Sequence, residues 1–154
     1  MPPRIIRGLE ELRTLVGQEI GKSDWLEITQ DRIQKFADVT GDHQWVHCNP
    51  EMAAAHSPYG TTIAHGFLTL SLCTMLAQEV NMIDGVRMGV NYGLNRVRFP
   101  NAVRVGSRIR MTSVLTDLKE IAGGGVQVTY KQTYEVEGEE KPACVAETLA
   151  RLYF

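Results

Sequence analysis

A carboxylate and an imidazole lie five residues apart in the segment GDHQWVH, residues 41–47. An ionised Asp42 accepts a hydrogen bond from water and a neutral His47 accepts another, so the two side chains can orient one water and exchange a proton with it. Gly41 frees the local backbone from regular geometry. The pair predicts general acid–base catalysis, although an aspartate that caps a turn beside a structural loop histidine would give the same pattern.

A second feature is His65-Gly66, which comes directly before an apolar segment with helical spacing. The unpaired N–H groups at the start of a helix stabilise negative charge on a nearby oxygen. Gly66 would also let a ligand carbonyl approach the backbone, unless it is only a helix-entry glycine. Ser71 is either a substrate contact or a small packing residue that bonds a carbonyl four residues earlier.

All four histidines lie within residues 43–65, so a zinc site must be considered. His43 and His47 have the spacing of the two histidines in HExxH, but Gln44 replaces the glutamate and no ligand pair lies on an evident helix. Cys48 beside His47 suggests a nucleophile and its base, but adjacent side chains of an extended segment point apart. The sequence therefore favours chemistry without a metal and without a cysteine nucleophile.

The elements that must position these residues are predicted from periodicity and from capping signals. Residues 67–80 are apolar on nearly every side of a helix, which therefore has to be buried. Alternation of apolar and polar residues predicts four antiparallel strands, at 88–99, 107–121, 125–138 and 144–154. Before the central helix we expect a helix over 8–16, a strand near 25–28, a helix from Thr29 to Gly41, a polar loop over 41–48 and a short helix from Asn49. The predicted fold is α+β, a curved antiparallel sheet wrapped around a long central helix.

Length and charge limit the classes of function. The 154 residues suit a single domain spanning 1–154, and the net charge of −2 lacks the basic excess of a nucleic-acid-binding protein. Three widely spaced cysteines fit a reducing cytoplasm, and no apolar run is long enough for a signal peptide or a membrane span. Because one curved layer leaves its helix and a strand edge uncovered, we expect a homodimer.

The segments FADVTGDHQWVHCNPEMAAA (36–55) and IAHGFLTLSL (63–72) together resemble the MaoC-like dehydratase family, the (R)-specific enoyl-CoA hydratases, and most closely its nodulation protein N-like branch. After its Asp-His signature, the family has a His-Gly pair and a serine on the following helix, which match His65, Gly66 and Ser71. Gln44-Trp45 replaces the Asn-Pro that is frequent in the family. The first part of the family signature is matched by Phe36, Val39, Thr40, Gly41, Asp42 and His47.

This resemblance implies a hot-dog fold, a dimer and the reversible syn hydration of a trans-2-enoyl thioester to the (R)-3-hydroxyacyl thioester. Asp42 and His47 would hold the attacking water, and the Gly66 N–H would polarise the thioester carbonyl. No cofactor is implied beyond the coenzyme A of the acyl-CoA substrate. The implied substrate-binding residues are Ser71, His65, Arg96 and Arg98, with Arg104 as a further candidate for the coenzyme A phosphates.

Two alternatives remain open besides the hydratase. A hot-dog acyl-CoA thioesterase would direct water at the thioester carbonyl instead of C3. A module that binds or senses acyl thioesters would show no turnover. The arginines, equally, would form an ordinary solvated strand face if they contacted no substrate.

Overall fold

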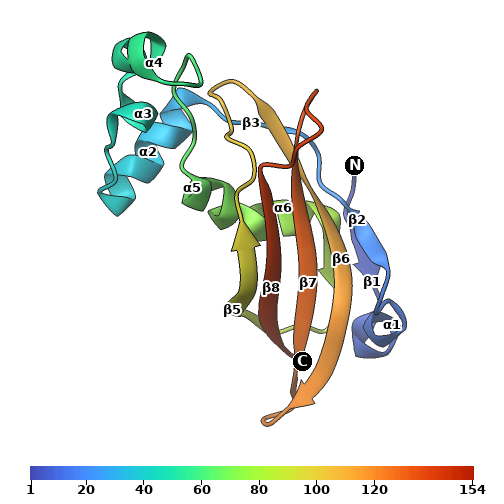
Figure 1. Ribbon diagram of the computed structural model, residues 1–154. Helices are drawn as coiled ribbons and strands as arrows, with labels where there is room; N and C mark the ends of the chain where they lie inside the picture. Colours follow the sequence, from blue (N-terminus) through green and yellow to red (C-terminus); the bar gives the residue numbers. More distant parts are fainter.

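The computed structural model describes residues 1–154. Six strands form one sheet in the order β2-β6-β7-β8-β5, with β3 paired to β6 (Figure 1). All pairs in this sheet are antiparallel, as expected from the alternating segments. The strands are β2 (Glu19–Lys22), β3 (Leu26–Glu27), β5 (Met88–Arg98), β6 (Arg108–Ile121), β7 (Gly125–Val136) and β8 (Cys144–Tyr153).

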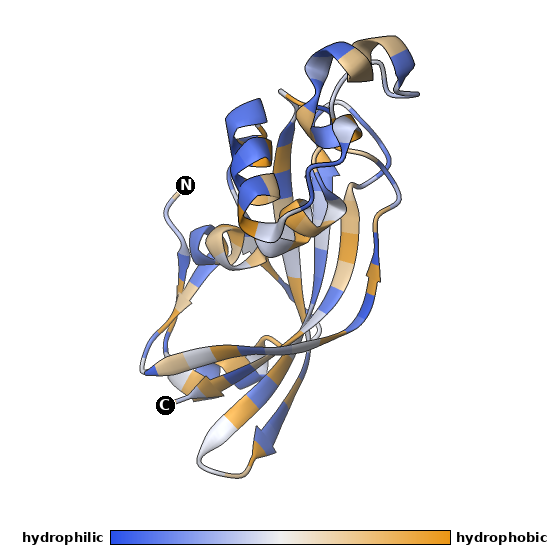
Figure 2. Cartoon of the chain, turned by 90° about the vertical axis from the view of Figure 1, so that its left-hand side faces the viewer, coloured by the Kyte–Doolittle hydropathy of each residue, from blue (hydrophilic) through white to orange (hydrophobic).

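The four long strands confirm the sequence prediction, but they do not form a simple meander. β6, β7 and β8 follow one another, whereas β5 pairs with β8 and so lies at the far edge of the sheet. Residues 99–107 carry the chain across from β5 to the start of β6. Hydrophobic and hydrophilic residues alternate along these strands, and the sheet curves around the helical layer (Figure 2).

The central helix consists of two segments, α5 (Gly66–Ser71) and α6 (Cys73–Val80). They meet at Leu72, where ψ is −4° and the regular α geometry is interrupted. One side packs on the sheet through Leu68, Leu72, Leu76 and Val80, none more than 6% exposed. In a single chain the helix is not covered on every side, as expected for one curved layer, because Phe67 is 69% exposed.

Three helices gather at one end of the sheet and carry the candidate site: α2 (Gln30–Thr40), α3 (Trp45–Cys48) and α4 (Pro50–His56) (Figure 1). As predicted, the Thr29 side chain caps α2 by accepting from the Arg32 N–H at 3.2 Å, and Gly41 ends it with φ of +81°. α4 also starts as predicted, after the Asn49 cap. The polar loop expected over 41–48 is wrong in its second half, which forms the single turn α3.

The first helix is confirmed as α1 (Gly8–Thr14). Two short strands were not anticipated, β1 (Arg4–Ile6) and β4 (Asn81–Ile83), which form a parallel pair apart from the main sheet. β2 was also missed. Strands of three or four residues are too short for alternation to be recognised. The architecture is the hot-dog fold, an antiparallel sheet wrapped around a central helix. None of its helices is long and apolar enough to cross a lipid bilayer.

Candidate active site

Asp42, His47 and His65 come together from three separate parts of the chain. Asp42 follows the end of α2, His47 lies in α3, and His65 directly precedes α5. A carboxylate oxygen and one ring nitrogen from each histidine all lie within 4.8 Å of one another. One water can hydrogen-bond two groups at such a separation, because each bond spans about 2.8 Å.

His47 is held in one orientation and one tautomer. Its Nδ1 lies 2.7 Å from the main-chain oxygen of Ile63, which can only accept, so Nδ1 carries the proton and donates it. Nε2 is then left with a lone pair to act as a base. The residue is 8% exposed, and burial lowers the pKa of His47 below its ordinary value of 6.5. The neutral form that a general base requires is therefore favoured near neutral pH.

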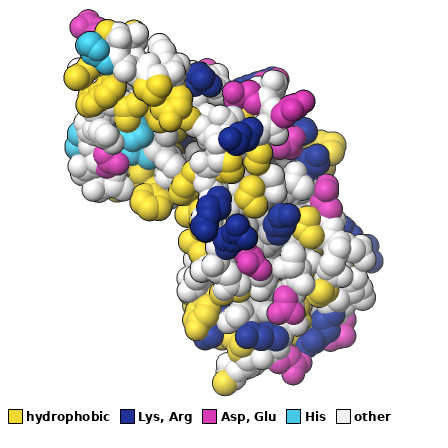
Figure 3. Space-filling model, viewed as in Figure 1, with side chains coloured by type: hydrophobic (Ala, Val, Ile, Leu, Met, Phe, Trp, Pro, Cys, Tyr) yellow, Lys and Arg dark blue, Asp and Glu magenta, His cyan; other side chains and the backbone are white.

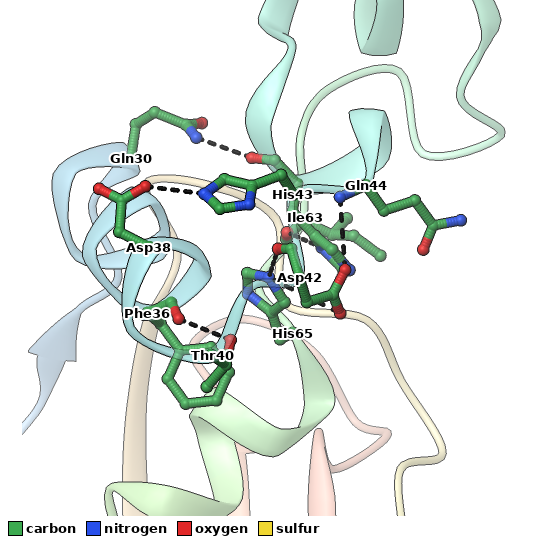
Figure 4. A network of polar contacts seen from close by, with 10 residues as sticks. Gln30, Phe36, Asp38, Thr40, Asp42, His43, Gln44, Ile63 and His65 are labelled. Carbon is green, nitrogen blue, oxygen red and sulfur yellow. Dashed lines mark hydrogen bonds and ion pairs between the residues drawn. The ribbon is translucent and has the colours of Figure 1, made fainter.

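Asp42 is the solvent-facing member of the pair, with a side chain 53% exposed. Its Oδ1 accepts from the Gln44 N–H at 3.3 Å, which is the turn-capping bond expected of a structural aspartate. Its main-chain oxygen accepts from His65 Nε2 at 2.9 Å (Figure 4). One carboxylate can cap the turn and still bind water, because it has about four acceptor positions.

The segment 62–65 lies along the segment that carries Asp42 and His47 and fixes it at several points. The Ile63 N–H donates to the Val46 carbonyl at 3.0 Å, while the Ile63 carbonyl accepts from the His47 ring. Gln30 on α2 donates to the His47 main-chain oxygen at 2.7 Å, and it accepts from the buried Thr62 hydroxyl. Sequence reasoning missed Gln30 and Thr62, since neither belongs to a recognisable motif.

Gly66 and His47 share a small cavity of about 200 Å³. Gly66 is the first residue of α5, and its N–H makes no hydrogen bond within the protein. A Cβ at this position would lie 3.1 Å from the Phe99 ring, so a larger residue would require that ring to shift slightly. The remaining lining residues are Tyr59, Ile63, Ala64, Thr69, Asn101, Ala102, Val103 and Ala143.

Ser71 lies away from the His47 cavity. Its hydroxyl donates to the Phe67 carbonyl four residues earlier at 2.6 Å, as the packing interpretation expects. Ser71 lines a second, larger cavity of about 640 Å³ between the central helix and the strands β5 and β8. The structure therefore does not bring Ser71 together with Asp42 and His47.

Arg96 and Arg98 are exposed on β5, and neither forms an ion pair. Arg98 donates to the Val97 carbonyl at 2.7 Å. Arg104 instead makes contacts within the protein, donating to the Tyr59 carbonyl at 3.2 Å and pairing with Glu139 at 3.5 Å. Lys and Arg side chains gather in the middle of the face shown in Figure 3.

Of the metal ligands considered from sequence, the structure brings His47 and His65 close together, beside Asp42. His43 turns away to Asp38, with Nε2 2.9 Å from a carboxylate oxygen. Asp42, His47 and His65 are close enough to hold an ion, but His65 Nε2 already donates to a main-chain oxygen. The Cys48 nucleophile is also disfavoured, because burial and nearby carboxylates raise the pKa of its thiol.

Comparison with known proteins identifies the family of the chain. Residues 11–137 match the family model described as MaoC like domain. The chain is 51% identical over 148 residues to 3-hydroxyacyl-thioester dehydratase Z of Mycobacterium tuberculosis, covering 96% of this chain and 97% of that protein. It is 44% identical over 147 residues to Nodulation protein N of Rhizobium leguminosarum bv. viciae, covering 95% and 91%.

The fold is also found in a solved structure described as the (R)-hydratase from A. caviae involved in PHA biosynthesis. The TM-score is 0.68 at 22% identity, over 88% of this chain and 94% of that chain. The family model spans most of the chain, and relatives of high identity match over nearly their full length. Both findings indicate the same family. The chain belongs to the MaoC-like dehydratase family and is a dehydratase of the MaoC type.

Proposed function

We propose that this protein catalyses the reversible hydration of a trans-2-enoyl-CoA to the (R)-3-hydroxyacyl-CoA. The observation that carries the proposal is the placement of the Asp42 carboxylate and the His47 ring within 4.8 Å, with His47 Nε2 free to accept. A similar relative acts, by its name, on 3-hydroxyacyl thioesters, and a structural neighbour is an (R)-hydratase.

In the hydration direction, Asp42 and His47 hold one water, whose oxygen attacks C3 as the water gives a proton to the pair, and the pair then returns that proton to C2. The new C3–O bond forms as the C2–C3 double bond moves its electrons toward the thioester carbonyl. The Gly66 N–H donates to that carbonyl oxygen as it gains enolate charge. Because the Asp42–His47 pair delivers both the water and the proton to the same face of the substrate, the addition is syn.

A panel of trans-2-enoyl-CoA substrates of different chain length tests the proposal through the loss of conjugated-alkene absorbance. Chiral chromatography of the product should give the (R) alcohol. Release of free coenzyme A thiol without loss of the alkene would instead identify a thioesterase. No turnover of any member of the panel would favour a binding module.

We propose that the reaction needs no metal, because the protein groups alone complete the proton transfers. His65, the third residue of the cluster, already donates its Nε2–H to the Asp42 main-chain oxygen. Activity should therefore survive extensive dialysis against a chelator. A loss of activity that zinc restores would contradict this.

Arg96 and Arg98 are assigned to the phosphates of coenzyme A, since both are exposed without ion-pair partners on the strand that leads to Phe99. Phe99 in turn borders the His47 cavity. Ser71 is assigned to the acyl portion, because it faces the larger cavity. Replacing both arginines by alanine should raise KM for an enoyl-CoA but not for the matching N-acetylcysteamine thioester, which lacks the phosphates.

The homodimer expected from sequence is proposed to form along β5. This eleven-residue edge strand pairs only with β8, and every residue except Val97 is exposed. An exposed apolar edge strand invites pairing with another strand. A second copy of the same strand can satisfy its free N–H and C=O groups. The exposed large apolar side chains on β5 are Met88, Val90, Tyr92 and Leu94.

Light scattering should give twice the chain mass of 17.2 kDa. Leu94→Lys should shift the protein toward monomer, because it places a charge on the edge strand of both copies. Val16→Lys is the matched control, since Val16 is 40% exposed next to α1, on the opposite side of the sheet from β5 (Figure 1). A monomeric wild-type protein at micromolar concentration, or a Leu94→Lys variant that stays fully dimeric, would contradict this interface.

As the pH is lowered, kcat/KM should fall with a midpoint below pH 6.5, the ordinary pKa of histidine. Catalysis needs His47 neutral, so activity falls as the pH drops through its pKa, and burial lowers that pKa. The kcat/KM profile is the relevant one, because it reports groups of the free enzyme. A limb centred above 6.5 would mean that another group titrates.

A further inference from the structure

His65 is the more enclosed of the two histidines of the site. It is 3% exposed and lines neither of the two cavities. Its ring stacks on the His47 ring with centroids 3.9 Å apart and an interplanar angle of 26°. The Phe36 ring packs against it at 4.9 Å. A ring in this position lies behind the reacting groups rather than against a substrate.

The hydrogen bonds of His65 define its protonation. Nε2 lies 2.9 Å from the Asp42 main-chain oxygen, which can only accept, so Nε2 carries a proton and donates it. Nδ1 of the neutral ring is then an acceptor, and it is buried with no partner. A buried polar atom without a partner is unfavourable, and few occur in native proteins. An apolar residue would avoid this cost. The unpartnered Nδ1 therefore suggests that the other ring nitrogen, Nε2, has a role that offsets it.

We infer that His65 is a positioning residue that holds Asp42 in its reactive place by donating Nε2–H to the Asp42 main-chain oxygen. The inference rests on the proposed hydration, in which Asp42 orients the attacking water. It replaces the substrate contact that the family resemblance implied for His65. His65 has no free atom for proton transfer, because Nε2 is engaged and Nδ1 is buried.

The need for such a restraint follows from the backbone around Asp42. The residue follows Gly41, whose φ of +81° ends α2, and its side chain is half exposed. His47, in contrast, is fixed by bonds from its ring to Ile63 and from Gln30 to its carbonyl. Asp42 is joined to the buried side of the site by the hydrogen bond from His65.

Two variants of nearly the same size as histidine separate the bond from the ring. His65→Leu removes the donor, whereas His65→Gln places an amide N–H near the position of Nε2. His65→Leu should lower kcat about 10- to 100-fold, the scale of a misplaced reacting group, with KM within about threefold. His65→Gln should recover kcat to within about fivefold of the wild type, because it restores the donor.

Val80→Ala serves as the control for a loss of stability, because it truncates a buried residue at the far end of α6. It should lower the melting temperature without lowering kcat, so a loss of kcat in His65→Leu is not a general effect of destabilisation. A Leu variant with wild-type kcat, or a Gln variant as slow as the Leu variant, would overturn the inference.

An NMR measurement on the unliganded protein is independent of turnover. The Gln44 amide donates to Asp42 Oδ1, so its chemical shift reports the position of Asp42. This shift should move in His65→Leu and return in His65→Gln, and the nitrogen shifts of His65 should show an unprotonated Nδ1. An unmoved Gln44 amide or a protonated Nδ1 would sink the inference. If the amide responds as expected but the wild-type protein hydrates no enoyl thioester, the positioning role stands and the proposed reaction fails.

Discussion

Asp42→Asn and His47→Gln should each lower kcat by roughly 10²- to 10⁴-fold, the scale of general acid–base catalysis. Asp42→Asn keeps the shape but removes the charged acceptor, and His47→Gln removes the basic Nε2. Because both side chains act on one water, neither can complete the proton transfers alone. The double variant should therefore be scarcely slower than the slower single variant.

Single-turnover hydration and thermal unfolding of all three variants test this. His43→Gln is a matched control, because His43 belongs to the same loop but pairs with Asp38 on the exposed side of α2. It should keep nearly full activity. If the pair were only structural, the variants would lose melting temperature and keep their turnover per folded molecule. Rate losses that multiply in the double variant would show two independent roles.

The fold class, and three residues of the candidate site that lie together, could be predicted from sequence because their signals are local. Alternation predicted the four long strands, and local motifs pointed to Asp42, His47 and His65, which the structure brings close together. What the sequence could not provide is pairing over long distances in the chain. β5 pairs with β8 about fifty residues later, and the order of strands in a sheet is not contained in the periodicity of any one strand.

The same limit applies within the site. His65 was recognised as a motif residue, but its stacking on His47 and its bond to the Asp42 carbonyl join residues about twenty apart. The exposure of Phe67 illustrates a related limit. An apolar helix surface indicates that something covers it, but hydrophobicity cannot distinguish a residue of the same chain from one of a second copy.

Gly66→Pro should lower kcat about 10²- to 10³-fold more than Gly66→Ala, the cost of removing one oxyanion-hole donor. Both variants add a Cβ 3.1 Å from the Phe99 ring, and Phe99 can yield because it is 39% exposed. Only proline removes the N–H. Proline is also compatible with the backbone, because Gly66 is the first residue of α5 and His65 has φ of −59° and ψ of 137°.

The two variants therefore differ at Gly66 chiefly in one hydrogen-bond donor. The ratio of their kcat values measures the contribution of that donor to the rate. Gly66→Ala should show a small loss, since Phe99 must shift at the edge of the cavity that contains His47. Melting temperatures should be similar, because the Gly66 N–H makes no bond within the protein and its loss leaves no acceptor unpaired. Equal rates for the two variants would mean that the thioester oxygen finds its donor elsewhere, and the start of α5 would then have only a packing role against Phe99.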